Sequence, residues 1–169
     1  MKILAISGSA SAKSSNTLLL QTMREQFQDI HTIEVYQDLR NWPLFRPEDL
    51  KKPIPPIVKE LKAKIAEAEG LIICTPEYTH NIPAVLKNTF EWMTASGEFA
   101  EKKVLPITFT PKEPRGEHAM QSLLFSLQTM NAKVVTQLPL YKNGVEIKEE
   151  QMILKEETHF LLLEAMKLL

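Results

Sequence analysis

ILAISGSASAKSSNT, residues 3–17, is the stretch from which the fold of this chain is predicted. Its first four residues are apolar, a run that is too short for a helix and typical of a buried strand. Ser7, Gly8 and Ser9 end that strand. Apolar residues then recur at helical spacing and predict a helix that begins near Asn16 and ends near Gln28. The stretch is therefore a strand, a polar loop and the N-terminus of a helix.

The polar loop is rich in side chains that can bind phosphate. Six hydroxyl or amide side chains occur within nine positions: Ser9, Ser11, Ser14, Ser15, Asn16 and Thr17. The first N–H groups of a helix have no acceptor inside the helix, and the helix dipole favours negative charge there. Hydroxyls and free amides directed at one point form a phosphate site. We predict such a site over the simpler interpretation of a serine-rich helix cap, with solvent-facing positions as the alternative for Ser11 and Ser15.

Two common nucleotide-binding loops do not match this stretch. The Walker motif needs two glycines separated by four residues and followed by Lys and Ser or Thr. Lys13 comes one residue too early after Gly8, and Ala12 precedes it in place of the second glycine. The dinucleotide fingerprint needs three glycines, and the loop has only Gly8. A terminal monophosphate therefore fits the loop best.

Length and composition limit the classes of protein to consider. A chain of 169 residues suits a single domain, residues 1–169, with a sizeable core. The net charge of −1 gives no attraction for nucleic acids or membranes, so neither partner is expected. The single cysteine, Cys74, cannot form a disulfide within the chain, which favours a cytoplasmic protein. We expect no apolar leader, no membrane span and, because the four histidines are scattered, no metal site.

Strand and helix patterns alternate along the rest of the chain. Strands are predicted at residues 3–6, 32–36, 71–74, 104–110 and 133–140, and helices at 16–28, 55–69, 83–93, 119–130 and 149–168. Such alternation predicts right-handed βαβ units and a parallel sheet covered on both faces. We predict an α/β fold of the flavodoxin-like type, a three-layer sandwich with a five-stranded parallel sheet in the order 2-1-3-4-5. The long segment Leu39–Pro56 is expected either to be functional or to pack over the core.

Ligands of such a sheet lie at the carboxyl ends of strands one, three and four. The loops predicted there are Ser9–Thr17, Pro76–Asn81 and Thr110–Gly116. In the first, Gly8-Ser9 followed by Ser14 and Asn16 matches the pattern G-S-x-R-x-x-S-x-N. The second loop and the helix after it match P-E-Y-N-x-x-x-P-x-x-L-K-N-x-x-D-W, through Pro76-Glu77-Tyr78, Pro83, Leu86-Lys87-Asn88 and Trp92. On these motifs the chain resembles the NADPH-dependent FMN reductase family, which includes azo-, chromate- and quinone-reducing members.

The resemblance implies bound FMN, with NADPH or NADH as cosubstrate. The cofactor-binding residues that it implies are Ser9, Ser11, Ser14, Asn16, Thr17, Pro76, Glu77, Tyr78, Thr79 and Thr110. No catalytic residue is predicted, because the flavin itself carries the hydride chemistry, and Glu77 is expected to orient rather than to act as a base. A homodimer or homotetramer is also implied, with Trp92 at the interface and burial within one chain as the competing possibility.

The chain departs from the family pattern in each of its three loops and at Glu91, the acid before Trp92. Ser11 stands where the family has an arginine for the phosphate, and Lys13 could supply the charge but not the planar fork. Thr79 replaces an asparagine. The third loop, Thr110–Gly116, keeps one glycine of a usually glycine-rich segment.

The resemblance therefore implies an FMN-dependent NAD(P)H oxidoreductase that works by a ping-pong mechanism. Reduced nicotinamide gives a hydride to the flavin and leaves, and a small-molecule electron acceptor such as a quinone or azo compound then takes its place. One alternative is a flavodoxin-type electron carrier, against which the near-neutral charge argues. The other is a flavin-free regulatory protein on the same scaffold, which the altered third loop favours.

Overall fold

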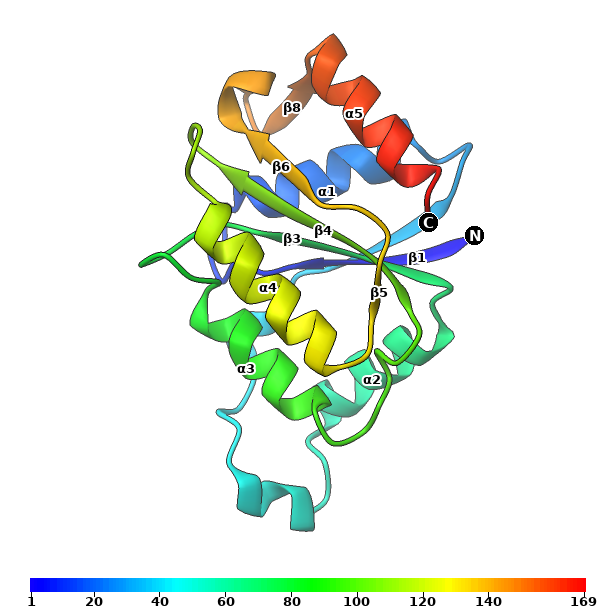
Figure 1. The fold of residues 1–169 in the computed structure, drawn as a ribbon, viewed down its shortest axis with the longest axis vertical. Helices are drawn as coiled ribbons and strands as arrows, with labels where there is room; N and C mark the ends of the chain where they lie inside the picture. Colours follow the sequence, from blue (N-terminus) through cyan, green and yellow to red (C-terminus); the bar gives the residue numbers. More distant parts are fainter.

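A parallel sheet lies at the centre of the structure, with helices on both of its faces (Figure 1). The computed structural model describes all residues, 1–169. The sheet strands are β1 (Lys2–Ser7), β2 (Thr32–Tyr36), β3 (Gly70–Thr75), β4 (Lys103–Thr110), β5 (Lys133–Val134) and β6 (Leu138–Tyr141). The helices are α1 (Ser15–Gln26), α2 (Pro56–Glu67), α3 (Ala84–Met93), α4 (Glu117–Thr129) and α5 (Glu156–Met166). The order β2-β1-β3-β4-β5 and the parallel pairing confirm the predicted flavodoxin-like fold.

Side chains of β1 alternate between two apolar cores, one on each face of the sheet. Leu4 and Ile6 belong to the core covered by α2, α3 and α4, whereas Ile3 and Ala5 belong to the core covered by α1 and α5. The strand reads as an unbroken apolar run because helices cover both faces. None of the helices combines the length and the apolar character needed to cross a bilayer.

The fifth predicted strand, residues 133–140, is divided into β5 and β6, and both pair with β4. Val104 pairs with Val134, and Ile107 pairs with Leu138. Three steps along β4 therefore correspond to four steps along its partner, so one extra residue is accommodated between β5 and β6. Such an insertion interrupts the ladder locally in the manner of a β-bulge, and hydrophobic alternation gives no signal for it.

The prediction of a helix beginning at Glu149 is wrong. Residues 145–154 form an antiparallel hairpin of β7 (Val145–Lys148) and β8 (Gln151–Leu154), and α5 begins only at Glu156. The two turn residues, Glu149 and Glu150, have φ values of 47° and 68°. A two-residue hairpin turn of type I′ needs positive φ at both positions, which Asn-Gly usually supplies. A Glu-Glu pair instead favours a helix by propensity, so the turn could not be predicted from these residue types.

The long segment Leu39–Pro56 contains two short 3-10 helices, η1 (Leu39–Asn41) and η2 (Pro47–Lys51), and projects at the bottom of Figure 1. Its base packs over the core, as one of the two expectations held. Trp42 is buried, and its indole N–H donates to the Tyr36 hydroxyl at 3.1 Å. The segment contributes no residue to the cavity described below.

Candidate cofactor site

Loops at the carboxyl ends of β1, β3 and β4 surround a cavity of about 360 Å³. These strand ends lie on the side of the sheet opposite the labelled N-terminus (Figure 1). Small-molecule sites have volumes of roughly 300–1,000 Å³. The lining residues are Ser9, Ser11, Lys13, Ser14, Ser15, Asn16, Pro76, Glu77, Tyr78, Phe109, Thr110, Pro111, Arg115 and Lys142. The predicted binding residues all line this cavity except Thr17 and Thr79.

The first loop leaves hydrogen-bond donors free at the start of α1. Ser14 caps the helix, and its hydroxyl accepts from the Thr17 N–H at 3.3 Å. The N–H groups of Ser15 and Asn16 have no acceptor within the chain. The loop is anchored by Gly8, whose N–H donates to the Cys74 carbonyl at 2.8 Å. Unused amides at a helix N-terminus, beside serine hydroxyls, match the donor set that binds a phosphate group.

Two buried residues hold this loop from behind. The Cys74 thiol donates to Oδ1 of Asn16 at 3.2 Å, which fixes the orientation of that amide. Burial raises the pKa of the Cys74 thiol well above its ordinary value, so the group stays neutral. Thr17 is buried as well, and its hydroxyl lies 2.7 Å from the Ser7 hydroxyl. Thr17 therefore supports the loop from the core side and does not face the cavity.

The second loop ends in a tight turn that carries Tyr78 and displaces Thr79. Tyr78 and Asn81 exchange two backbone hydrogen bonds, each of 3.0 Å. Thr79 and His80 occupy the turn with φ values of 50° and 56°. Thr79 is thus at an exposed tip outside the cavity lining, whereas Pro76 and Tyr78 form part of its wall.

Glu77 lines the cavity, but its carboxylate is used to hold a helix. Oε2 accepts from the N–H of Ala119 at 3.0 Å, in the first turn of α4. The residue that precedes α4, Gly116, has no side chain with which to cap it. Only 10% of the Glu77 side chain is exposed, and Oε1 lies 3.6 Å from Nδ1 of His80. A carboxylate at a helix N-terminus is favoured both by the free amide and by the dipole, so Glu77 ties the second loop to α4.

The third loop closes on itself through Thr110. The buried Thr110 hydroxyl donates to the carbonyl of Arg115 at 2.7 Å. Gly116 then has a φ of 107°, which favours glycine, and a Cβ there would lie 3.0 Å from the Thr108 hydroxyl. The one glycine that this loop keeps is therefore at the position where the backbone requires it.

Three cations surround the cavity: Lys13, Arg115 and Lys142. Phe109 and Lys142 are cavity residues that the sequence analysis did not predict. Phe109 precedes Thr110 on β4, and Lys142 follows β6 directly. Thr110 pairs with Tyr141, so the end of β6 lies at the same edge of the sheet as the third loop. Placing the end of the fifth strand beside the other carboxyl ends was the signal that could have identified Lys142.

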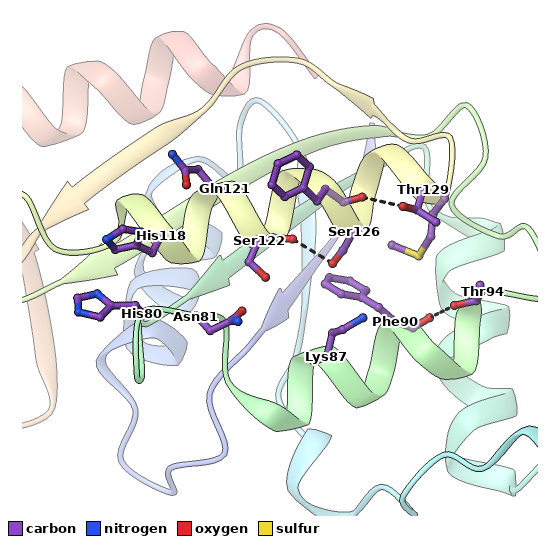
Figure 2. A pocket seen from close by; sticks show the side chains of 12 residues that line it. His80, Asn81, Lys87, Phe90, Thr94, His118, Gln121, Ser122, Ser126 and Thr129 are labelled. Carbon is purple, nitrogen blue, oxygen red and sulfur yellow. Dashed lines mark hydrogen bonds between the residues drawn. The ribbon is translucent and has the colours of Figure 1, made fainter.

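A second hollow, of about 470 Å³, lies between α3 and α4 (Figure 2). Side chains of Lys87 and Phe90 on α3 face those of Ser122 and Ser126 on α4. The expectation that Trp92 lies at an interface is wrong for the side chain itself. Trp92 is 2% exposed within its own chain, and its indole N–H donates to the Pro43 carbonyl at 2.9 Å. The aromatic motif residue thus clamps the long segment after β2 instead of facing a partner.

Taken together, a flavodoxin-like sheet and a phosphate-binding loop at its switch point define a mononucleotide-binding protein. The family model for NADPH-dependent FMN reductases matches residues 1–144, so the chain belongs to the NADPH-dependent FMN reductase family.

Curated relatives and solved structures agree with this assignment. Over 106 residues the chain is 42% identical to the NADH:(hydroxy)cinnamate reductase subunit CrdA of Vibrio ruber, covering 62% of this chain and 52% of that one. It therefore spans about half the length of that relative. An NADPH azoreductase of a Bacillus species is 25% identical over 153 residues, which is 90% of this chain and 82% of the relative. The flavoenzyme FerB of Paracoccus denitrificans has the same fold, with a TM-score of 0.77, 17% identity and coverage of 98% and 93%.

The donor set of the cavity fits the cofactor of this family. FMN ends in a phosphate group that carries a charge near −2, for which the free N–H groups of Ser15 and Asn16 and the cations nearby are suited. In the same cavity, Pro76, Tyr78 and Pro111 provide flat or apolar surfaces for a ring system. The residues present therefore fit FMN.

Proposed function

We propose that this chain is an FMN-dependent NAD(P)H oxidoreductase that reduces a small-molecule electron acceptor. The proposal depends on one observation: free donors at the start of α1 and the side chains of Pro76 and Tyr78 belong to one cavity. The similarity to a cinnamate reductase subunit and to an azoreductase supports the same class of reaction.

When bound, FMN supplies the redox chemistry, taking a hydride from the reduced nicotinamide and passing electrons to the acceptor. The chain's own residues bind and orient. We assign the hydroxyls of Ser9 and Ser14 and the N–H groups of Ser15 and Asn16 to the terminal phosphate. Pro76 and Tyr78, held by the turn that Asn81 closes, are assigned to the ring. Fixed distance and stacking then provide most of the rate enhancement.

Glu77 has no proton-transfer role in this proposal. Its carboxylate is engaged with the Ala119 N–H, and it holds the second loop in place against α4. The acceptor binds over the exposed side of the cavity, where the Tyr78 side chain is 53% exposed.

We propose a homodimer whose interface is the hollow between α3 and α4. Phe125 on α4 lines the hollow and is 69% exposed, so its ring is available to pack against a second chain. One end of the hollow is formed by His80 and His118, whose rings lie 4.6 Å apart (Figure 2). Because His80 belongs to the second cavity loop, a second copy of the chain bound here would form part of the wall of the cofactor site. A cytoplasmic location is part of the proposal, since NAD(P)H is available there and Cys74 is a free thiol.

The visible spectrum of the purified protein tests the proposal. We expect a flavin absorption band, either in the protein as isolated or after addition of micromolar FMN, that bleaches when NADPH or NADH is added without oxygen. NAD(P)H oxidation with a soluble quinone, and with no partner reductase present, should then proceed catalytically. A protein that stays colourless with FMN and oxidises neither nucleotide would overturn the proposed function. Bleaching that needs a separate reductase would favour an electron carrier.

A further inference from the structure

The phosphate loop lacks the arginine of its family pattern, because Ser11 stands at that position. A phosphate monoester nevertheless has a charge between about −1.5 and −2 near neutral pH. Hydroxyls and amides can donate hydrogen bonds to it but cannot neutralise it. A cation from another element is therefore needed beside the start of α1, where the phosphate would bind.

Lys142, directly after β6, lies beside the start of α1. It lines the cavity of about 360 Å³ and also a neighbouring hollow of about 510 Å³ on the other side of the first loop. Both spaces are lined by Lys13, Ser14, Ser15 and Lys142. Lys142 is thus placed beside the start of α1, where the free N–H groups of Ser15 and Asn16 are located.

The short turn that carries Lys142 is held firmly. It is the 3-10 helix η3 (Lys142–Gly144), between β6 and the hairpin. The carbonyl of Gly144 accepts from the N–H of Lys155 at 3.0 Å. Gly144 also packs so closely on Thr158 of α5 that a Cβ there would clash with the threonine hydroxyl. The backbone of Lys142 is therefore fixed relative to the sheet, although its side chain is exposed.

Lys13 and Lys142 differ in their partners. The Lys13 ammonium lies 2.9 Å from the Glu150 carboxylate at the tip of the β7–β8 hairpin. Lys142 has no carboxylate within 4.0 Å, so its ammonium is free to pair with a ligand. Arg115, the third cation, also has no carboxylate partner, but it lines only the cavity and not the neighbouring hollow that Ser14, Ser15 and Lys142 share.

We propose that Lys142 replaces the missing arginine as the principal cation for the FMN phosphate, with Lys13 as a weaker contributor shared with Glu150. The inference rests on the proposed function and adds a binding residue to it. Because lysine is a point charge, the replacement provides attraction without the bidentate geometry of arginine. The contact should therefore affect the phosphate alone and leave the ring unaffected.

The test compares FMN with riboflavin, which has the same ring and no phosphate. Both are titrated into the flavin-free protein, and dissociation constants are obtained from flavin fluorescence. Lys142→Met should weaken FMN binding by roughly two- to fivefold, the range for an exposed ion pair, and leave riboflavin binding unchanged. Lys142→Arg should restore the FMN affinity. Lys148→Met removes an exposed lysine of the neighbouring hairpin that lines neither space, and should change neither constant.

The outcomes separate the two proposals. If the unmodified protein binds neither FMN nor riboflavin, the proposed function fails and the role of Lys142 fails with it. If the unmodified protein binds FMN but Lys142→Met leaves both constants unchanged, or weakens both equally, the role of Lys142 is wrong and the proposed function stands. An unchanged thermal unfolding midpoint of Lys142→Met, together with recovery in Lys142→Arg, excludes a folding defect as the cause of any loss.

Discussion

Replacing Glu77 separates a structural role from a catalytic one. Its carboxylate is 10% exposed and accepts from the Ala119 N–H at 3.0 Å, at the start of a helix with no other side-chain cap. Removing a cap costs about 0.5–2 kcal/mol, and a buried bond to a charged group about 1.5–3 kcal/mol. We therefore expect Glu77→Ala to lower the free energy of unfolding by about 1.5 kcal/mol. For a domain of this size that corresponds to roughly 3–6 °C in the unfolding midpoint.

Urea denaturation and steady-state turnover, measured on the same preparations, check this prediction. Glu77→Gln keeps a neutral acceptor and should lose about half as much stability, while its kcat with saturating FMN should stay within about threefold of the parent because the flavin carries the chemistry. Glu60→Gln, an exposed glutamate on α2, is the matched control and should change stability by less than about 0.5 kcal/mol. Loss of a general base would instead reduce kcat by about 10²–10⁴. Such a loss in Glu77→Gln at unchanged stability would refute the capping argument.

Four further predictions follow from particular contacts. Gly8→Ala places a Cβ 2.8 Å from Leu86 Cδ2 and should cost about 1–3 kcal/mol of stability and weaken FMN binding, as urea denaturation and flavin titration would show. Cys74 should resist thiol reagents in the folded protein and react fully in denaturant, because its thiol is buried and its pKa is raised; rapid labelling without denaturant would contradict this. Trp92→Phe removes one hydrogen bond from the indole to the long segment after β2 and should cost about 1 kcal/mol by urea denaturation without changing the oligomeric state. Phe125→Glu should convert the proposed dimer to monomers in analytical ultracentrifugation, and a monomeric parent protein would contradict the proposed interface.

The strands of the sheet could be predicted from the sequence, because burial on both faces gives each strand a continuous apolar run. The four apolar residues Ile3–Ile6 could only be a buried strand, and each later apolar run repeated that pattern. Two features were missed because they depend on pairing between strands. The extra residue between β5 and β6 becomes apparent only when the register against β4 is known. The hairpin turn at Glu149-Glu150 uses backbone angles that its residues rarely adopt.

Some cavity residues could be predicted from the sequence and others could not. Residues next to the ends of β1 and β3 could be placed from the sequence, because glycine, proline and hydroxyl residues mark where a strand ends and a helix begins. Lys142 follows the predicted fifth strand closely and was missed because only the loops after the first, third and fourth strands were considered. Thr17 and Thr79 were assigned to the cavity through the family resemblance. Thr17 instead occupies a position of α1 that faces the core, and Thr79 lies at the exposed tip of a turn.

A crystal structure of the protein with FMN tests the central claim most directly. We expect the phosphate within hydrogen-bond distance of the N–H groups of Ser15 and Asn16, and the ring against Pro76 and Tyr78. An empty cavity at saturating FMN, or a phosphate bound away from the start of α1, would contradict the account.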